Sequence, residues 1–526
     1  MKKPTIERDA ASLSPSLRRY FYFTAAVTGA AIMIVEILGA KMLAPFFGTS
    51  HFVWTAQIAV TLVGLAAGYY AGGRLVDLLP RARLLFLCIL AAAVYLGFSV
   101  VFVESMSLSF LKLNLAAGAL LTSTFLYFVP LGLLAMVGPF AVRVLTESVH
   151  RVGGNVGRLT AVSTLGSFLG TMLIGYVLIP LLPNSLSMYS TSGLLAAVSL
   201  GYFVLHDRRG PLNSAAVALF VFAGLICLAE VRRHDAIAHV KVDVLFEGNS
   251  NFGQLQVVQL KETRQLYYFN DGLLQNTYDA DAKKSISPFS YLLHGLARAY
   301  TAEIKEALCI GMGVGIVPMT FVQEGAAVDV VEINPAIVPV ARRFFDCEPE
   351  RFRLHVGDGR QFLHGLDRKY DAIVLDAFLG DSSPGHLMTR EAFAAMRAAL
   401  NPGGTLVVNT FGEYEEGREF ASASIERTLR AVFRSVRIHG EGVGNGNVYY
   451  AASDREELKT LRGFDHETVH PSIRIRAMEA FEQQLPSLVE KGRGIVLRDD
   501  YNPVDFYDAA NREESRRRTV EWLQRM

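Results

Sequence analysis

The sequence has few cysteines and almost no net charge. Its 526 residues include 4 cysteines, and 51 Lys and Arg against 50 Asp and Glu leave a net charge of +1. The cysteines, Cys88, Cys227, Cys309 and Cys347, show neither a disulfide framework nor a metal-ligand spacing, so we expect no bound metal. A near-neutral chain also lacks a basic surface for nucleic acid, and we expect no nucleic-acid partner.

Charged residues are scarcest between residues 20 and 229, where one apolar run follows another. A hydrocarbon core about 30 Å thick needs roughly 20 helical residues to cross it. Seven runs approach that length: 20–47, 53–72, 84–103, 115–140, 159–182, 186–205 and 212–229. A short run could be a buried helix of a soluble protein, but seven in succession predict a multi-pass α-helical membrane domain over residues 1–235, embedded in the lipid bilayer. The first run is too long for a removable signal peptide and lacks a small-residue cleavage site.

The short loops between these runs alternate between basic and nearly uncharged. The basic ones contain Arg74, Arg81 and Arg83, then Arg143, Arg151 and Arg158, then Arg208 and Arg209. Basic residues also precede the first run, so the positive-inside tendency predicts a cytoplasmic N-terminus in the cell membrane. Seven crossings would then place the rest of the chain outside.

Two kinds of residue stand out within the apolar runs. Glu36 is a carboxylate in the first run, and such a group is costly in a membrane unless it is paired or hydrated. Lys41 lies roughly 140° further round the same helix, so the two should not pair there. Either an interhelical ion pair or a substrate or proton role would explain them. Gly166 and Gly170 are expected at helix contacts.

From residue 242 onward the pattern changes to short alternating segments. VDVLFEG, GQLQVVQL and RQLYYF, with Gly and Asn at the breaks, predict a small β-hairpin subdomain over residues 240–290. From Glu306 onward strands and helices alternate, which predicts a Rossmann-like α/β domain with a parallel sheet over residues 291–526.

A glycine-rich turn follows the first strand of this domain. The strand ALCI runs into Gly311, Gly313 and Gly315, and a helix is expected to begin near Val317. Glycines let a backbone approach a ligand closely, and a helix N-terminus offers unpaired N–H groups to it. The turn therefore predicts a nucleotide-binding loop.

Acidic residues follow the next three predicted strands. These strands end at Glu332, before Asp358 and Gly359, and at Asp376. Ligands of open α/β sheets bind beyond the carboxyl ends of the strands, so the three acids should ring one crevice. Glu332 is placed to accept hydrogen bonds from both ribose hydroxyls. Asp371 starts its strand at the opposite edge and is expected to be structural.

The segments LHVGDGRQFL, YDAIVLDAF and NDGLLQNT resemble the polyamine aminopropyltransferases, of which spermidine synthase is the best known. The resemblance covers residues 251–412, and the apolar region before it is similar to that of membrane-fused spermidine synthase-like proteins. It implies a transferase of polyamine biosynthesis that binds two small molecules, an amine and an S-adenosyl nucleoside. The donor would be decarboxylated S-adenosylmethionine, the product methylthioadenosine, and no cofactor would be tightly bound. A homodimer is compatible with this expectation.

The resemblance also implies residue roles. It assigns the nucleoside to Gln254, Gly311, Gly313, Gly315, Glu332, Asp358 and Gly359. It assigns the acceptor to Asp271, Gln275 and Asp381, and makes Asp376 the catalytic residue that handles the attacking amine.

The sequence departs from the family on the amine side. Val314 stands where the family has the Asp that contacts the aminopropyl end, and Pro288, Phe289 and Ser290 replace a Tyr-His-Glu or Tyr-Gln-Glu motif. The second acid after the fourth strand is displaced to Asp381. Because one exposed ion pair contributes only about 0–1 kcal/mol, a dication needs several carboxylates, and the acceptor need not be putrescine.

Two alternatives remain open. Val314 also suits a methyltransferase that uses S-adenosylmethionine itself. Glu36, together with Gly72-Gly73-Arg74, which resembles a cytoplasmic loop of major-facilitator transporters, suits a transporter or sensor that only binds a nucleoside or polyamine. The cytosolic supply of the donor favours a cytoplasmic α/β domain, which requires that the run 212–229 does not cross fully.

Overall fold

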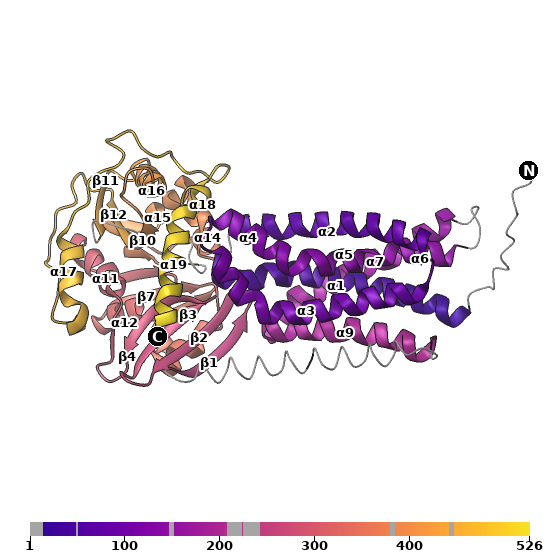
Figure 1. The fold of residues 1–526 in the computed structure, drawn as a ribbon. Helices are drawn as coiled ribbons and strands as arrows, with labels where there is room; N and C mark the ends of the chain where they lie inside the picture. The colour runs from indigo at the N-terminus through magenta and orange to yellow at the C-terminus, as the bar shows by residue number, and fades with distance from the viewer. Residues whose placement is uncertain are drawn as a thin grey trace, which may run out of the picture. The chain divides into compact units, whose positions relative to one another are not determined.

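The structure is a computed structural model. It describes residues 14–48, 51–146, 152–207, 224, 242–378, 384–440 and 446–525. The chain divides into two compact units, residues 1–237 and 238–526. Within the described ranges the first unit contains helices only, and the second contains both helices and strands (Figure 1).

The first unit consists of long helices. Unbroken α-helices are α1 (Pro15–Phe47), α2 (His51–Leu78), α3 (Ala82–Phe110) and α9 (Asn184–Leu205). One further run joins α4 (Leu115–Ser123), the π-helical turn η1 (Thr124–Phe128), α5 (Val129–Ala135) and α6 (Val137–Leu145). Another joins α7 (Val152–Leu173), the π-helical turn η3 (Ile174–Leu178) and α8 (Ile179–Leu181). Each π turn ends two residues before a proline, Pro130 or Pro180, whose missing N–H interrupts the regular hydrogen bonding.

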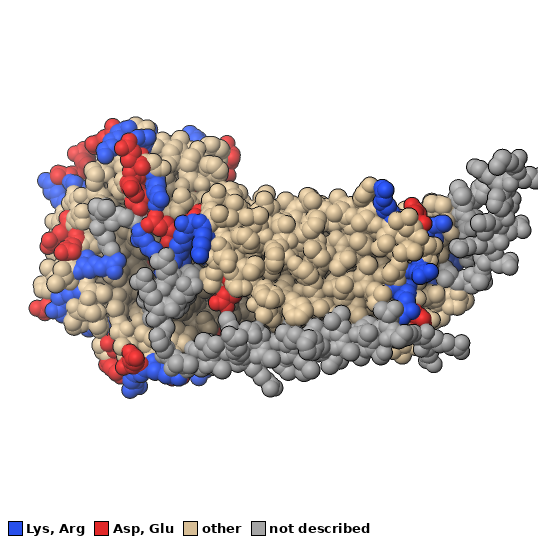
Figure 2. Space-filling model, in the orientation of Figure 1, with Lys and Arg blue, Asp and Glu red and all other residues tan. Residues whose placement is uncertain are grey.

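Among the described residues, six of these helical runs are long and apolar enough to cross a membrane, by length and composition. They correspond to the first six predicted runs. The seventh, 212–229, lies outside the described residues except for residue 224, as do Arg151, Arg208 and Arg209. Figure 2 shows that the visible face of these helices is nearly free of charged side chains along its middle.

Glycine allows α7 to pack closely against α1. A Cβ added to Gly166 would lie 2.1 Å from the carbonyl oxygen of Ala26, and one at Gly170 would lie 2.6 Å from the Cα of Ala30. Only residues without a side chain permit this separation of two backbones. The predicted role of both glycines at a helix contact is confirmed.

The second unit begins with an antiparallel sheet in the order β1 to β5. Its strands are β1 (Val242–Ser250), β2 (Gly253–Leu260), β3 (Gln265–Asn270), β4 (Leu273–Asp279) and β5 (Lys284–Ser285). Asp271 and Gly272 form the turn between β3 and β4, with φ angles of 46° and 73°. Such left-handed pairs match the twist of a hairpin, and Asp-Gly is a favoured sequence for them.

A seven-stranded sheet follows, in the order β11-β12-β10-β9-β6-β7-β8. Its strands are β6 (Glu306–Ile310), β7 (Ala327–Glu332), β8 (Arg353–Val356), β9 (Tyr370–Leu375), β10 (Leu400–Gly412), β11 (Ser435–Gly440) and β12 (Gly446–Ser453). The sheet is parallel from β8 to β10, and β12 pairs antiparallel with β10 and β11. The chain winds outward in both directions from β6, so the switch point lies beyond the carboxyl ends of β6 and β9, where ligands of such sheets bind.

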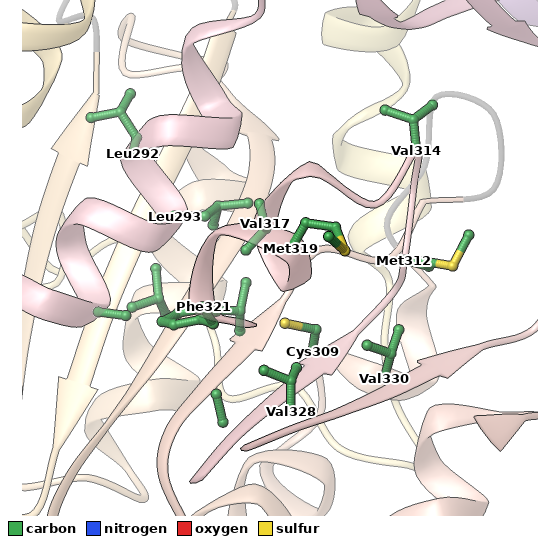
Figure 3. Close-up of a cluster of buried hydrophobic side chains, with 14 of the residues drawn as sticks. Leu292, Leu293, Cys309, Met312, Val314, Val317, Met319, Phe321, Val328 and Val330 are labelled. Carbon is green, nitrogen blue, oxygen red and sulfur yellow. The ribbon is translucent and has the colours of Figure 1, made fainter. Parts of the chain in front are cut away.

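Helices accompany this sheet. They are α11 (Pro288–Tyr300), α12 (Ile316–Gln323), α13 (Ile337–Phe344), α14 (Gly359–Leu363), α15 (Arg390–Ala398), α16 (Phe420–Arg430), α17 (Arg474–Glu482), α18 (Val504–Tyr507) and α19 (Ala509–Arg525). Figure 3 shows one part of the core, where Val317, Met319 and Phe321 of α12 meet Cys309 of β6 and Val328 of β7. This packing fixes the position of α12 and hence of the glycine turn that precedes it.

Candidate functional site

A cavity of about 380 Å³ lies at the carboxyl ends of the strands of the large sheet. Its volume falls within the range of about 300–1,000 Å³ that is usual for small-molecule sites. The walls come from the glycine turn after β6, from the ends of β7, β8, β9 and β10, and from β3 and β4 of the small sheet. The cavity therefore lies where the strand order predicts a ligand site.

The glycine turn lines the cavity, and each of its three glycines meets a different structural requirement. A Cβ at Gly311 would lie 2.1 Å from the carbonyl oxygen of Asp376, and the φ angle of Gly311 is 96°. Gly315 caps α12 with a φ angle of 87°, and a Cβ there would lie 2.3 Å from Sγ of Cys347. Gly313 has a φ angle of 53° and open space on its Cβ side. That space leaves room for a ligand against the backbone.

Glu332 stabilises the glycine turn by accepting a hydrogen bond from its backbone. Its Oε2 accepts a hydrogen bond from Met312 N at 2.9 Å, and its Oε1 accepts one from Asn334 N at 2.7 Å. Burial raises the pKa of this carboxyl, and the backbone donors oppose the rise. Glu332 lines the cavity, and each carboxylate oxygen can accept a second hydrogen bond. A ribose diol would find both acceptors in place.

Asp358 is the N-cap residue of α14 and also lines the cavity. Its Oδ1 accepts a hydrogen bond from Gln361 N at 2.9 Å, and its Oδ2 lies 2.9 Å from Nε2 of His386. Burial alone would raise the pKa of Asp358, but these two donors outweigh it and lower the pKa. The neighbouring Gly359 is buried, and a Cβ there would lie 2.5 Å from Cγ2 of Ile310.

Asp376 lies directly beyond the end of β9, beside β6 and β10. Burial raises the pKa of its carboxyl to about 6, a hydrogen bond from Asn409 opposes the rise, and the charge of Glu332 adds to it. Nδ2 of Asn409 donates to Oδ1 of Asp376 at 2.8 Å, and Nδ2 of Asn447 donates to Oδ1 of Asn409 at 2.9 Å. A carboxylate with a pKa near neutrality can accept a proton at physiological pH.

A bulge in β4 turns consecutive residues towards the cavity. Tyr268 of β3 pairs with Asn276, and Phe269 pairs with Leu274, so Gln275 has no opposing residue. Leu274, Gln275 and Asn276 all line the cavity, although alternate residues of a regular strand would face opposite sides. The predicted acceptor residue Gln275 thus lies at the cavity wall.

Other candidate residues lie elsewhere. Gln254 is not among the lining residues, and its Nε2 donates to Oε1 of Glu247 at 2.5 Å. Asp271 does not line the cavity either, and its Oδ1 accepts a hydrogen bond from Gln254 N at 2.9 Å, which holds the hairpin turn. Asp381 lies outside the described residues. The structure therefore brings together the acids at the strand ends, whereas Gln254 and Asp271 lie outside the cavity lining.

Glu36 and Lys41 belong to the other unit, on α1, where both are half-buried. In the described part of the chain neither forms an ion pair. Of the two explanations considered for Glu36, an interhelical ion pair or a substrate or proton role, the ion pair is not found within those ranges.

The sequence reasoning missed Asn409 and His386. Asn409 is 1% exposed within the apolar stretch TLVVNTF of β10, and an amide in such a strand is a usable signal because a buried polar group needs a partner. His386 comes from the short helix Gly385–Leu387, 28 residues after Asp358, and no local pattern indicates that contact.

Residues 289–439 match the sequence model of the spermine/spermidine synthase domain. The chain carries a spermine/spermidine synthase domain. It is 42% identical over 118 residues to a polyamine aminopropyltransferase of Vibrio vulnificus, a match that covers 21% of this chain and 40% of the relative. It is 27% identical over 258 residues to a probable polyamine aminopropyl transferase of Bifidobacterium longum, covering 48% of this chain and 53% of that protein. The chain thus spans about half or less of the length of these relatives.

A solved structure is also similar to this synthase domain. The spermidine synthase of Thermotoga maritima aligns over 47% of this chain and 86% of its own, with 17% sequence identity and a TM-score of 0.37.

Proposed function

We propose that the protein is a membrane-bound aminopropyltransferase that moves an aminopropyl group from decarboxylated S-adenosylmethionine to an amine. The observation that carries the proposal is Asp376, a carboxylate with a pKa of about 6 that shares one cavity with Glu332 and Asp358. The match of residues 289–439 to the synthase domain and the named activities of the relatives support it.

In the proposed reaction the acceptor nitrogen attacks the aminopropyl carbon bonded to the sulfonium. A C–N bond forms while the C–S bond breaks, the electron pair of the broken bond returns to sulfur, and neutral methylthioadenosine leaves. The nitrogen loses one proton, which Asp376 accepts at Oδ2 while Asn409 holds Oδ1. The enzyme then contributes alignment of two bound molecules and one positioned base.

Glu332 and Asp358 would hold the nucleoside, the first through the ribose and the second near the adenine. Both carboxylates are fixed by donors from the protein, Met312 N and Asn334 N for Glu332 and Gln361 N for Asp358. Acceptors that are already held in place lose little conformational entropy when a ligand binds. The nucleoside-binding roles proposed for Glu332 and Asp358 therefore fit carboxylates that backbone hydrogen bonds already hold in position.

A second candidate is methyl transfer from S-adenosylmethionine. It is favoured by Val314, which is 2% exposed and lines the cavity where the family has an acid for the aminopropyl end. Both reactions fit one fold and the same nucleoside contacts.

The test supplies the purified full chain with either donor and a mixture of amines. Methylthioadenosine formed only from the decarboxylated donor supports aminopropyl transfer, whereas S-adenosylhomocysteine from S-adenosylmethionine supports methyl transfer. If calorimetry detects methylthioadenosine binding but neither product forms, a binding role replaces both reactions.

A further inference from the structure

A row of two amides continues from Asp376 across the edge of the large sheet. Asp376 follows β9, Asn409 is on β10 and Asn447 is on β12, and these strands are neighbours in that order. Nδ2 of Asn447 lies 2.9 Å from Oδ1 of Asn409, whose Nδ2 lies 2.8 Å from Oδ1 of Asp376. All three side chains line the cavity. The row therefore links the proposed base to a residue two strands away.

The register between the strands fixes this row. Asp376 and Asn409 directly follow a parallel residue pair of β9 and β10, so they lie side by side. Asn447 pairs with Phe411 of β10, two residues beyond Asn409, which makes it a diagonal neighbour of Asn409. Diagonal neighbours on one face of a sheet are within reach of each other's side chains. The hydrogen-bonded row is thus a consequence of the strand pairing.

The direction of the row follows from what each group can donate. An ionised carboxylate only accepts hydrogen bonds, so Asn409 must turn its Nδ2 towards Asp376 to stabilise that form. The oxygen of the same amide then points to β12, where Nδ2 of Asn447 donates to it. Asn409 is 1% exposed, and a buried amide oxygen without a donor costs free energy. The donor on β12 therefore favours the orientation in which Asn409 donates to Asp376.

The opposite orientation of Asn409 would have the opposite effect on the base. Its Oδ1 would face Asp376, and two oxygen acceptors share a hydrogen bond only when the carboxyl is protonated. A protonated Asp376 cannot accept the proton of the attacking amine. Hydrogen bonds in series also polarise one another, so the donor from Asn447 strengthens the bond from Asn409 to Asp376. The orientation of one amide thus decides which form of the carboxyl is stabilised.

We propose that Asn447 is a positioning residue of the transfer reaction, which acts on Asp376 through Asn409 by holding that amide with its Nδ2 towards the carboxylate. The proposal rests on the proposed aminopropyl transfer with Asp376 as the base. A residue that acts in this way changes the proton affinity of the base without binding the nucleoside or the amine itself.

Other ionisable groups surround Asp376. Burial raises its pKa and the charge of Glu332 adds to the rise. Burial and the charge of Asp376 raise the pKa of Cys309 on β6, so this thiol stays protonated. Among the described residues, the other titratable side chains that line the cavity, from β3, β7, the loop after β8 and the short helix 385–387, are Tyr268, Glu332, Asp358 and His386. All of these groups are common to the proteins compared below, so their contributions cancel in ratios of rates.

The test is a double-mutant cycle on Asn409 and Asn447 that is read as a pH profile. Leu has nearly the size of Asn and no polar atom, so Asn447→Leu removes the donor with little change of shape. The purified full chain is saturated with decarboxylated S-adenosylmethionine, and methylthioadenosine release from a subsaturating mixture of butylamine, putrescine and cadaverine gives kcat/KM from pH 5 to pH 9. Dividing each value by that of the wild type cancels the titration of the amines.

The ratio for Asn447→Leu should be constant above about pH 8 and roughly three- to tenfold lower at pH 5, because one hydrogen bond corresponds to roughly half a pH unit to one unit. Asn409→Leu should show a fall at least as large. In the Asn409→Leu background, Asn447→Leu should add less than about twofold at any pH, because its route to Asp376 is gone.

Asn401→Leu is the matched control. It is the same substitution on the same strand, and Nδ2 of Asn401 donates to Oδ1 of Asp371 at 2.7 Å, at the opposite edge of the sheet. Its ratio should not change with pH, although its thermal midpoint should fall.

Two results would overturn the proposal and leave aminopropyl transfer standing. A ratio for Asn447→Leu that is independent of pH would indicate a structural or amine-binding residue, which lowers kcat/KM equally at every pH. The same fall with and without Asn409 would show that Asn447 acts on Asp376 by another route. If the wild type forms no methylthioadenosine, the proposed function fails and this proposal fails with it.

Discussion

Replacing Asp376 by Asn isolates the chemical role of one carboxylate. The amide keeps the size of the side chain, and its Oδ1 can still accept the hydrogen bond that Asn409 donates at 2.8 Å. The cavity should therefore keep its shape, and the change removes the ability to accept a proton. General-base catalysis of this kind contributes about 10²- to 10⁴-fold, so kcat should fall by that factor. Methylthioadenosine binding should stay within about twofold.

The pH dependence separates a base from a residue that only shapes the site. The pKa of Asp376 is raised to about 6, so the active, ionised form is complete above about pH 7 and is lost as the pH falls through 6. The acceptor amine titrates equally in both proteins, and taking the ratio of wild-type to variant kcat/KM cancels its contribution. That ratio should be constant above pH 7 and should fall about tenfold per pH unit below pH 5.

Methylthioadenosine release from pH 4.5 to pH 9 provides the measurement. Asp371→Asn is the control, because Asp371 lies on the same strand at its opposite end and accepts hydrogen bonds from Lys305 N at 2.8 Å and Glu306 N at 3.0 Å. Its effect should appear in thermal stability, with kcat near the wild-type value. A ratio independent of pH, or a wild-type rate in Asp376→Asn, would refute the assignment of Asp376 as the base.

Four further changes test the site and the side of the membrane proposed for the C-terminus. Asn409→Ala removes the donor that favours the ionised form of Asp376, so the acidic limb of the rate profile should move to higher pH, and an unmoved limb would argue against the contact. Gly313→Ala should weaken methylthioadenosine binding at least tenfold with a thermal midpoint within a few degrees of wild type, because its Cβ side is open space in the protein alone. Gly311→Ala should lower the midpoint further, since its Cβ would lie 2.1 Å from a carbonyl oxygen, and equal thermal effects of the two substitutions would contradict this geometry. A reporter fused after Met526 should be active on the cytoplasmic side, where the donor is made, and activity only on the outer face would favour a sensing or transport role.

Much of the site follows from local sequence. The runs that end at Glu332 and Asp376 are apolar and β-branched, and the glycine turn directly follows the preceding strand ALCI, so strand ends could be located from patterns a few residues long. Parallel strands then place their carboxyl ends at one edge. The small sheet was predicted only in part, because three strands were expected and five are present. The two-residue strand β5 is too short for an alternating pattern.

Roles transferred from the family to individual residues of this chain were harder to predict. Gln254 and Asp271 fit the family motif, yet their side chains hold β1 and the hairpin turn and do not line the cavity. Gln275 reaches the cavity wall through a bulge that depends on the pairing of β3 with β4. A motif records which residue occurs, whereas the register between strands decides where its side chain points.

The sequence by itself determined where the strands end and which residues close them, because alternation and turn chemistry act over short stretches of chain. The tertiary structure alone decided what surrounds Asp376. Asn409 is 33 residues away in sequence and reaches it because β9 pairs in parallel with β10, with Leu375 beside Val408. The pKa of about 6 arises because distant segments exclude water from the carboxyl and bring the charge of Glu332 near it, and no local pattern contains that information.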